Sequence, residues 1–215
     1  VVAGHTVAMP KKGQRTAKTW PGDASDATGF AALCAAYLDA LRVLNYSEKT
    51  VESRAHHLRE FVKWAHERSL ARPSEVTKPI LERYQRYLYH HRKKNGQPLS
   101  FRSQHGALVP VRAFFKWLCR QNHLLANPAA DLDLPRAEKR LPRHVLTASE
   151  AERVLALPDM GDALGLRDRA ILEALYSTGM RRMELIGLKL YDLDQERGTV
   201  FVRQGKGKKD RMIPM

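Results

Sequence analysis

The chain has 215 residues, with 37 Lys and Arg against 23 Asp and Glu, and a formal net charge of +14 at pH 7. This length accommodates one or two compact domains, and the hydrophobic share of 43% excludes a wholly disordered chain. The sequence contains no run of about 18 apolar residues that would span a membrane, and no apolar segment typical of a secretory signal peptide. The excess of positive charge favours a polyanionic partner, with nucleic acid first and an anionic membrane surface second.

Two cysteines, Cys34 and Cys119, lie inside apolar helical patterns and form no Cys-x-x-Cys or Cys/His spacing. This usage indicates a reducing compartment without a disulfide framework. We therefore expect a cytoplasmic protein that has no zinc or other metal site and no cofactor.

Residues 1–26 contain Gly, Pro, Lys and small polar residues without periodicity, which predicts a flexible basic tail. A helical period follows from Phe30 to Leu41 and ends at Asn45. A second helical pattern begins after Ser47, a candidate N-cap, and extends to Leu70.

Two further helices are predicted before residue 125. One begins after Thr77 and ends at Asn95-Gly96, and the other begins at Ser100 and closes near Asn122. Pro110 lies within the last pattern and predicts a kink there. Residues 27–125 therefore read as a four-helix bundle that folds alone.

The composition changes over residues 126–142, where prolines and charged residues predict an extended linker. A capping box then opens a short helix at Thr147, and a stronger helix covers Leu166 to Ser177. The remaining elements, in chain order, are a helix end at Gly179, a short helix over Arg182–Leu188, a strand over Thr199–Arg203, a turn over Gly205–Asp210 and a second strand from Met212. The fold class is mainly α, with residues 143–215 as the beginning of an α+β domain with a small antiparallel hairpin.

Residues 167–188 read RDRAILEALYSTGMRRMELIGL, and GKGKKDRMIP follows after a short β segment. This pattern resembles the tyrosine recombinase, or phage integrase, family, and its Xer-like and integron-integrase-like branches most closely. The motif positions that match are Tyr176, Thr178, Gly179, Met180, Arg181, Glu184 and Lys206. The preceding helical bundle is similar to the family's SAM-like core-binding domain.

The resemblance implies a site-specific recombinase that cuts and rejoins DNA through a 3′-phosphotyrosyl intermediate in a synaptic tetramer. It assigns Arg181 to the scissile phosphate and makes Lys206 the general acid for the leaving 5′-oxygen. A planar guanidinium can stabilise two non-bridging oxygens at once through paired donors. Glu184, three residues after Arg181, faces the same side of the following helix and could orient Arg181 or a neighbouring cation.

Simpler interpretations compete with these assignments. Arg181 alone would be a surface arginine, with Arg182 as a competing choice, and Gly205-Lys206-Gly207 alone would be a tight turn. The family's later His/Lys-x-x-Arg pair, its His or Trp and its tyrosine nucleophile have no counterpart here, and Tyr176 and Tyr191 are not substitutes. We expect the chain to be truncated before these motifs and not to complete strand cleavage.

Basic residues also gather in the helical half, where residues 47–94 hold 12 Lys and Arg against 6 Asp and Glu. In the family the corresponding helices face duplex DNA, although an ordinary solvated helix face is an equal alternative for any single residue. The predicted DNA contacts are Lys49, Thr50, Arg54, Arg59, Lys63, Arg102, Ser103, Arg112, Lys116, Lys208, Lys209 and Arg211.

Three hypotheses follow. The first is the recombinase, bacterial in type, with double-stranded DNA and further copies of itself as partners and a nucleoid-associated location. The second is a non-catalytic DNA-binding remnant that regulates a recombinase. The third is a basic RNA-binding or membrane-surface protein, in which Arg181, Glu184 and Lys206 would have no purpose.

Overall fold

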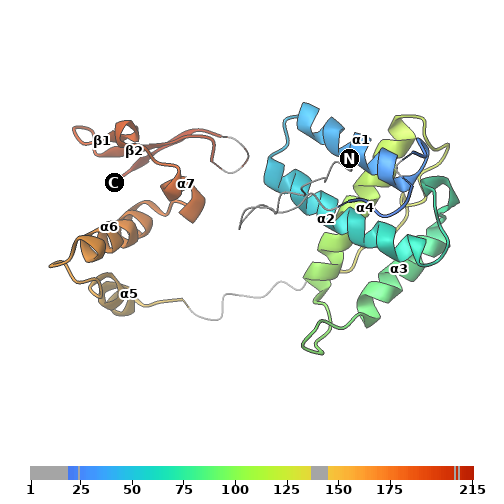
Figure 1. Ribbon diagram of the computed structural model, residues 1–215. Coiled ribbons are helices and arrows are strands. Elements are labelled where there is room, and N and C mark those ends of the chain that lie inside the picture. Colours follow the sequence, from blue (N-terminus) through green and yellow to red (C-terminus); the bar gives the residue numbers. More distant parts are fainter. Residues whose placement is uncertain (1–18, 24, 137–144, 206, 208) are drawn as a thin grey trace, which may run out of the picture. The chain divides into compact units, whose positions relative to one another are not determined.

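The computed structural model describes residues 19–23, 25–136, 145–205, 207 and 209–215, and the chain divides into two compact units, Val1–Arg140 and Leu141–Met215 (Figure 1). The first unit contains the helices α1 (Phe30–Val43), α2 (Glu48–His66), α3 (Lys78–His90) and α4 (Phe101–Arg120), and the short 3-10 helix η1 (Pro73–Glu75). The second contains α5 (Ala148–Leu155), α6 (Ala163–Thr178), α7 (Arg182–Ile186), the 3-10 helix η2 (Leu190–Asp192), β1 (Leu193–Asp194), β2 (Thr199–Val202) and β3 (Arg211–Pro214). In the described part of the chain, none of the helices combines the length and the hydrophobicity that a membrane span requires.

The helix ends of the first unit follow the sequence signals. The hydroxyl groups of Ser47 and Ser100 accept hydrogen bonds from the amides three residues later, at 3.3 and 3.2 Å. These bonds satisfy donors that the first helical turn leaves free. Asn45 and Asn122, which follow α1 and α4, adopt positive φ angles of 61° and 60°. The predicted starts of α2 and α4 and the predicted end of α1 are therefore confirmed.

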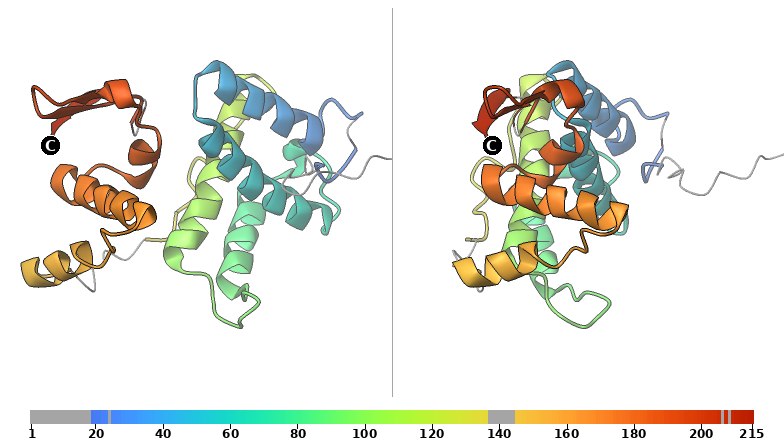
Figure 2. Two further views of the ribbon diagram at one scale, coloured as in Figure 1. Left: turned by 60° about the vertical axis from the view of Figure 1, so that its left-hand side comes forward. Right: turned by 90° about the vertical axis from the view of Figure 1, so that its left-hand side faces the viewer.

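The core of the first unit is built around Phe61 of α2, whose side chain is fully buried. Its ring lies 5.0 Å from Tyr84, 5.9 Å from Phe30, 6.0 Å from Phe115 and 6.1 Å from Trp64, measured between centroids. These residues come from all four helices, and α4 packs against each of the other three (Figures 1 and 2). Burial of large aromatic side chains is the main stabilising contribution to such a bundle.

The helix α3 is shorter than predicted, and α4 contains a proline. The helix α3 ends at His90, before the predicted end at Asn95-Gly96, and His91 just beyond it is exposed. The helix α4 continues through Pro110, which is buried within it. Proline lacks the amide that would bond the carbonyl of Gly106 four residues earlier, so neighbouring helices must support this turn.

The segment expected to be an extended linker differs from that expectation over residues 127–135. Ala129 and Leu132 are 1% and 3% exposed and belong to the core of the first unit, and Leu134 packs against it. The carbonyl of Pro135 also lies 3.2 Å from Nδ1 of His105 on α4. Ala129 and Leu132 lie between prolines and belong to no periodic apolar pattern. Their burial is therefore visible only in the tertiary structure. Residues 137–144 lie outside the described residues.

The expected tail has a packed portion. Residues 1–18, including the basic stretch Lys11–Lys18, lie outside the described residues. Beyond them, Trp20 packs partly against the core, and the guanidinium of Arg59 lies 4.8 Å from the centre of its ring. Asp26 accepts a hydrogen bond from Arg72 at 2.8 Å, which lowers the pKa of this carboxyl to about 2. Trp20 and Asp26 are therefore attached to the bundle.

The second unit contains a three-stranded antiparallel sheet in the order β1-β2-β3. Its β2–β3 hairpin confirms the predicted one, with Thr199 opposite Pro214 and Val202 opposite Arg211. The strand β1 was not predicted, because two residues are too few to show an alternating pattern. Gly179 ends α6 with φ of 60°, as predicted, and a side chain there would be strained.

Burial of Cys34 yields a chemical prediction. Its side chain is fully buried, and desolvation raises the pKa of the thiol far above its usual range, whereas Cys119 is only half-buried. Because the thiolate is the nucleophile, we expect iodoacetamide to alkylate Cys34 at least about tenfold more slowly than Cys119 in the folded chain. Peptide mass spectrometry over time measures both rates. Equal rates before urea is added would contradict the buried position.

Candidate active site and DNA-binding surface

Arg181 is presented at the start of α7. It directly precedes the first helical residue and follows the left-handed turn at Gly179 by two positions. Its backbone amide donates to Oε2 of Glu184 at 2.9 Å, and its Nη1 donates to Oε1 of the same carboxylate at 3.1 Å. The side chain of Arg181 stays 58% exposed. The remaining guanidinium donors are therefore free to meet a ligand in solution.

Glu184 is the buried centre of this site, with a side chain only 6% exposed. Besides Arg181 it accepts a two-pronged contact from Arg211 of β3, with Nη1 at 3.0 Å and Nη2 at 2.6 Å. This contact raises the pKa of Arg211. One buried carboxylate thus joins the start of α7 to the loop end of the β2–β3 hairpin, and its charge is more than balanced by two guanidiniums.

Gly205 explains how the hairpin comes so close to this pair. A Cβ at this position would lie 2.7 Å from Nη1 of Arg211 and 2.8 Å from Oε1 of Glu184. The backbone of Gly205 therefore approaches the Glu184–Arg211 pair so closely that only glycine fits without displacing it.

The loop after Gly205 is described in part. Lys206 and Lys208, the predicted general acid and a predicted phosphate contact, lie outside the described residues. Lys209 is exposed, and its carbonyl accepts a hydrogen bond from the amide of Gly205 at 2.9 Å. The hydrogen bond between Gly205 and Lys209 joins the two residues that flank the segment containing Lys206.

Arg211 is one of the predicted phosphate contacts, and in the structure its guanidinium bonds to Glu184. Sequence reasoning predicted that Glu184 would orient Arg181 or a neighbouring cation, and the structure brings both cations to it. The separation of 27 residues between Glu184 and Arg211 explains why spacing alone could not identify the second partner.

The predicted DNA contacts on α2 fall into two groups. Lys49 and Lys63 are exposed, and Thr50 is half-buried beside the N-cap. Arg54 donates to the hydroxyl of Tyr37 at 2.6 Å and is half-buried. Arg59, stacked on Trp20, is also half-buried and faces the segment before α1. Its guanidinium thus contacts Trp20 within the protein, and its predicted DNA contact stays a prediction.

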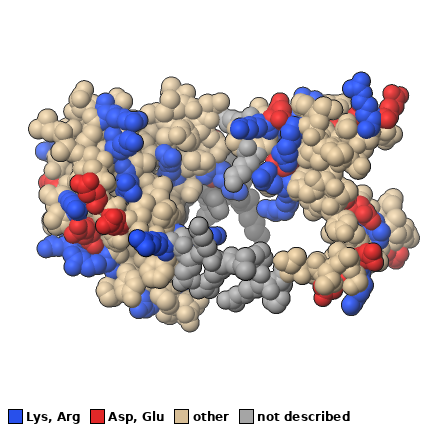
Figure 3. Space-filling model, turned by 180° about the vertical axis from the view of Figure 1, so that it is seen from behind, with Lys and Arg blue, Asp and Glu red and all other residues tan. Residues whose placement is uncertain are grey.

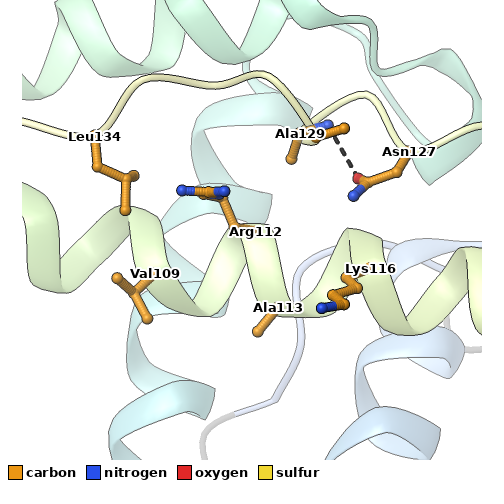
Figure 4. Close-up of a pocket in the computed structure, with 8 residues that line it drawn as sticks. Val109, Arg112, Ala113, Lys116, Asn127, Ala129 and Leu134 are labelled. Atoms are coloured by element: carbon orange, nitrogen blue, oxygen red, sulfur yellow. Dashed lines mark hydrogen bonds between the residues drawn. The ribbon is translucent and has the colours of Figure 1, made fainter.

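The predicted contacts on α4 lie at two places along the helix. Arg102 and Ser103 are exposed in its first turn. Arg112 and Lys116 line a groove of about 460 Å³ between α4 and the segment that carries Asn127, Ala129 and Leu134 (Figure 4). None of these four side chains forms an ion pair with a residue that the structure describes.

The surface carries the charge that the composition indicates. On the face drawn in Figure 3, blue Lys and Arg side chains cover more of the first unit than red Asp and Glu side chains do, and the red ones gather in one group. Within the described ranges, no three His, Cys, Asp or Glu side chains are placed to hold a metal ion. The Lys and Arg side chains on this face attract an anionic ligand.

Known proteins share both parts of this architecture. The N-terminal SAM-like domain of phage integrases matches residues 33–123, and the phage integrase family matches residues 144–215. The chain is 54% identical over 180 residues to tyrosine recombinase XerC 2 of Ralstonia nicotianae. This alignment covers 84% of this chain and 52% of that relative. The chain thus spans about half the length of this curated relative.

Two solved structures share the fold. A lambda integrase tetramer bound to a Holliday junction matches with a TM-score of 0.62 and 19% identity, over 89% of this chain and 52% of that one. The Tn1549 transposon integrase in complex with a circular intermediate DNA matches with a TM-score of 0.59 and 21% identity, over 85% and 60%. The sequence motif around Arg181, the helical first unit and these matches agree, and the chain belongs to the phage integrase family of tyrosine recombinases.

Proposed function

We propose that this chain forms the duplex-DNA-binding part and the first part of the catalytic site of a site-specific DNA recombinase. The observation that carries this proposal is the arrangement at Glu184. A buried carboxylate fixes an exposed arginine at the family's motif position and, through Arg211, the loop end of the hairpin that bears Lys206. A solvated surface arginine would need no such support.

In the proposed reaction, Arg181 binds the non-bridging oxygens of the scissile phosphate. Negative charge grows on these oxygens as a nucleophile attacks, so a fixed guanidinium stabilises the transition state more than the ground state. Lys206 gives its proton to the 5′-oxygen as that oxygen leaves. Glu184 positions Arg181 and takes no part in proton transfer. We assign the tyrosine nucleophile to none of the residues of this chain.

The DNA-binding surface that we propose is smaller than the sequence indicated. Arg54, Arg59 and Arg211 leave the proposed set because their guanidiniums are engaged within the protein. The remaining residues are Lys49, Thr50, Lys63, Arg102, Ser103, Arg112, Lys116, Lys208 and Lys209. The DNA complexes among the structural neighbours support this assignment.

The assembly and the location are also proposals. The tetrameric lambda integrase is the precedent for self-association on DNA. We infer that the full protein assembles as a tetramer on its recombining sites, and that it acts with the DNA of the bacterial cytoplasm. Analytical ultracentrifugation with and without duplex DNA tests the assembly, and we expect the larger species only when DNA is present.

The DNA-binding proposal predicts a steep dependence on salt. Each phosphate contact releases counterions, so the slope of log K against log salt changes by about 0.9 for every contact. We expect Lys49→Ala, Lys63→Ala and Lys116→Ala each to reduce the magnitude of that slope by about 1. Fluorescence anisotropy of labelled duplex DNA across a salt series measures it.

Lys78→Ala provides the matched control, because Lys78 is an exposed cation at the start of α3 outside the proposed set. We expect its slope to equal that of the unaltered chain. Equal changes for Lys78 and for the three proposed contacts would indicate attraction to net charge alone and would contradict the proposed surface.

A further inference from the structure

The loop that carries Lys206 is held at both ends by backbone hydrogen bonds. Gln204 adopts φ of 46°, and its amide donates to Oδ1 of Asp210 at 2.6 Å. The amide of Gly205 donates to the carbonyl of Lys209. A positive φ at a residue other than glycine is costly and persists only where surrounding contacts impose it. The contacts that impose it lie on either side of this loop.

On the β3 side, the contact is the Glu184–Arg211 pair already described. On the β2 side, a second pair has the same chemistry. Nε of Arg203 donates to Oδ1 of Asp192 at 2.7 Å, and the Asp192 side chain is only 2% exposed. The other carboxylate oxygen of Asp192 accepts the amide of Lys189 at 3.0 Å and so fixes the carboxylate to η2. The Arg203 bond lowers the pKa of Asp192.

The guanidinium of Arg203 is also confined by aromatic rings. Its Cζ lies 4.8 Å from the ring centre of Phe201 and 5.5 Å from that of Tyr191. Cation–π contact with two rings and one bond to a buried carboxylate leaves this side chain few alternative orientations. Arg203 directly precedes Gln204, so its restraint acts on the residue with the strained backbone.

From these contacts we propose that Asp192 and Arg203 are positioning residues, which hold the backbone of Gln204 and Gly205 at the β2 end of the loop and thereby act on the general-acid step assigned to Lys206, the next residue in the sequence. The role rests on the function proposed above, because it gives the loop its purpose. The loop is thereby anchored by two arginines, one at each strand end, each bonded to a buried carboxylate from the segment that precedes the sheet. Neither Asp192 nor Arg203 touches the reacting atoms.

The first test measures the loop in the 215-residue chain. Asp192→Asn retains the shape of the side chain but removes its charge. We expect the backbone amides of Gln204 and Gly205 to exchange with solvent about tenfold faster, because local opening of the loop becomes easier. The amide of Leu172 in α6 should change by less than about twofold. Hydrogen exchange followed by NMR measures all three.

Asp194→Asn is the matched control. Asp194 lies two residues further along, and it accepts the amide of Arg197 at 3.0 Å in the β1–β2 turn. We expect this variant to leave Gln204 and Gly205 unchanged. If Asp192→Asn accelerated Leu172 as much as the loop amides, the pair would stabilise the whole unit and the positioning role would be wrong. Unchanged loop amides would overturn it equally.

The second test uses the recombinase that contains this chain and a suicide substrate whose leaving 5′-oxygen is replaced by sulfur. A thiolate leaves without a proton, so it does not need the general acid. Asp192→Asn should slow cleavage of the ordinary substrate at least about tenfold with unchanged DNA affinity, and cleavage of the sulfur substrate should be nearly normal.

Lys206→Ala separates the two proposals in the same assay. If the sulfur substrate does not rescue Lys206→Ala, the general-acid assignment in the proposed function fails. If the sulfur substrate rescues Lys206→Ala, the proposed function stands. The positioning role then fails in either of two cases: Asp192→Asn cleaves the ordinary substrate at the normal rate, or it stays slow on both substrates. Rescue of both variants supports the inference.

Discussion

Replacing Arg181 by Ala in the recombinase that contains this chain is expected to lower the rate of DNA cleavage by about 10²- to 10³-fold, with little change in DNA affinity. The guanidinium is exposed, and its bond to Glu184 holds it in one orientation before the phosphate binds. Removing a prepared donor to a developing negative charge costs about 3 to 4 kcal/mol in the transition state. Single-turnover cleavage of a nicked suicide substrate measures this rate, and anisotropy measures affinity.

Arg182→Ala is the matched control for this prediction. Arg182 is the adjacent residue, is exposed, and has no partner among the residues that the structure describes. We expect a change of less than about threefold in cleavage, since surface substitutions away from special contacts have small effects. A loss on replacing Arg182 that equals the loss on replacing Arg181 would show that the register of the motif has been assigned wrongly.

Replacing Phe61 by Ala is expected to destabilise the helical unit by about 3 to 5 kcal/mol. Phe61 is fully buried and contacts aromatic rings of the other three helices, so the substitution leaves a cavity that cannot close without moving several elements. Such a loss is a large part of the roughly 5 to 15 kcal/mol that stabilises a typical domain. Urea unfolding followed by circular dichroism measures the change.

Phe101→Ala is the corresponding control on a surface phenylalanine. Phe101 is 43% exposed at the start of α4 and contacts Tyr89 at a centroid distance of 6.5 Å. We expect a loss below about 1 kcal/mol, because little buried area and no cavity are involved. Equal losses for the two phenylalanines would contradict the assignment of Phe61 to the centre of the core.

Much of the fold could be predicted from the sequence because local signals and tertiary packing agree. The hydroxyl caps at Ser47 and Ser100 and the capping box at Thr147 each depend on residues only three positions apart. Helices with one apolar face then have a single way to bury that face. The bundle was therefore predictable in outline.

The packing of residues 127–135 was not predictable by the same means. Its buried residues, Ala129 and Leu132, carry no period, and prolines flank them. Their burial depends on the surface that α4 offers, which includes Val109 and Ala113. A short non-helical segment acquires structure only from such a partner, so local patterns indicate an extended linker.

The candidate site divides in the same way. The contact between Arg181 and Glu184 follows from three-residue spacing at a helix start, and the sequence indicated it. The pairs Glu184–Arg211 and Asp192–Arg203 join residues 27 and 11 positions apart, and they depend on how the hairpin meets α7 and η2. A charge pattern cannot distinguish such pairs from cations directed at DNA, which explains why the sequence did not indicate the bond between Arg211 and Glu184.

The central claim is that Arg181 acts on the negative charge of the scissile phosphate. A suicide substrate with a neutral methylphosphonate at that position, cleaved by the recombinase that contains this chain, tests it most directly. Arg181→Ala should lose about 10²- to 10³-fold in rate on the phosphate substrate. On the methylphosphonate the loss should fall below about tenfold, because a methyl group replaces one non-bridging oxygen and the transition state carries one negative charge fewer for Arg181 to stabilise. An equal loss on both substrates would contradict the claim.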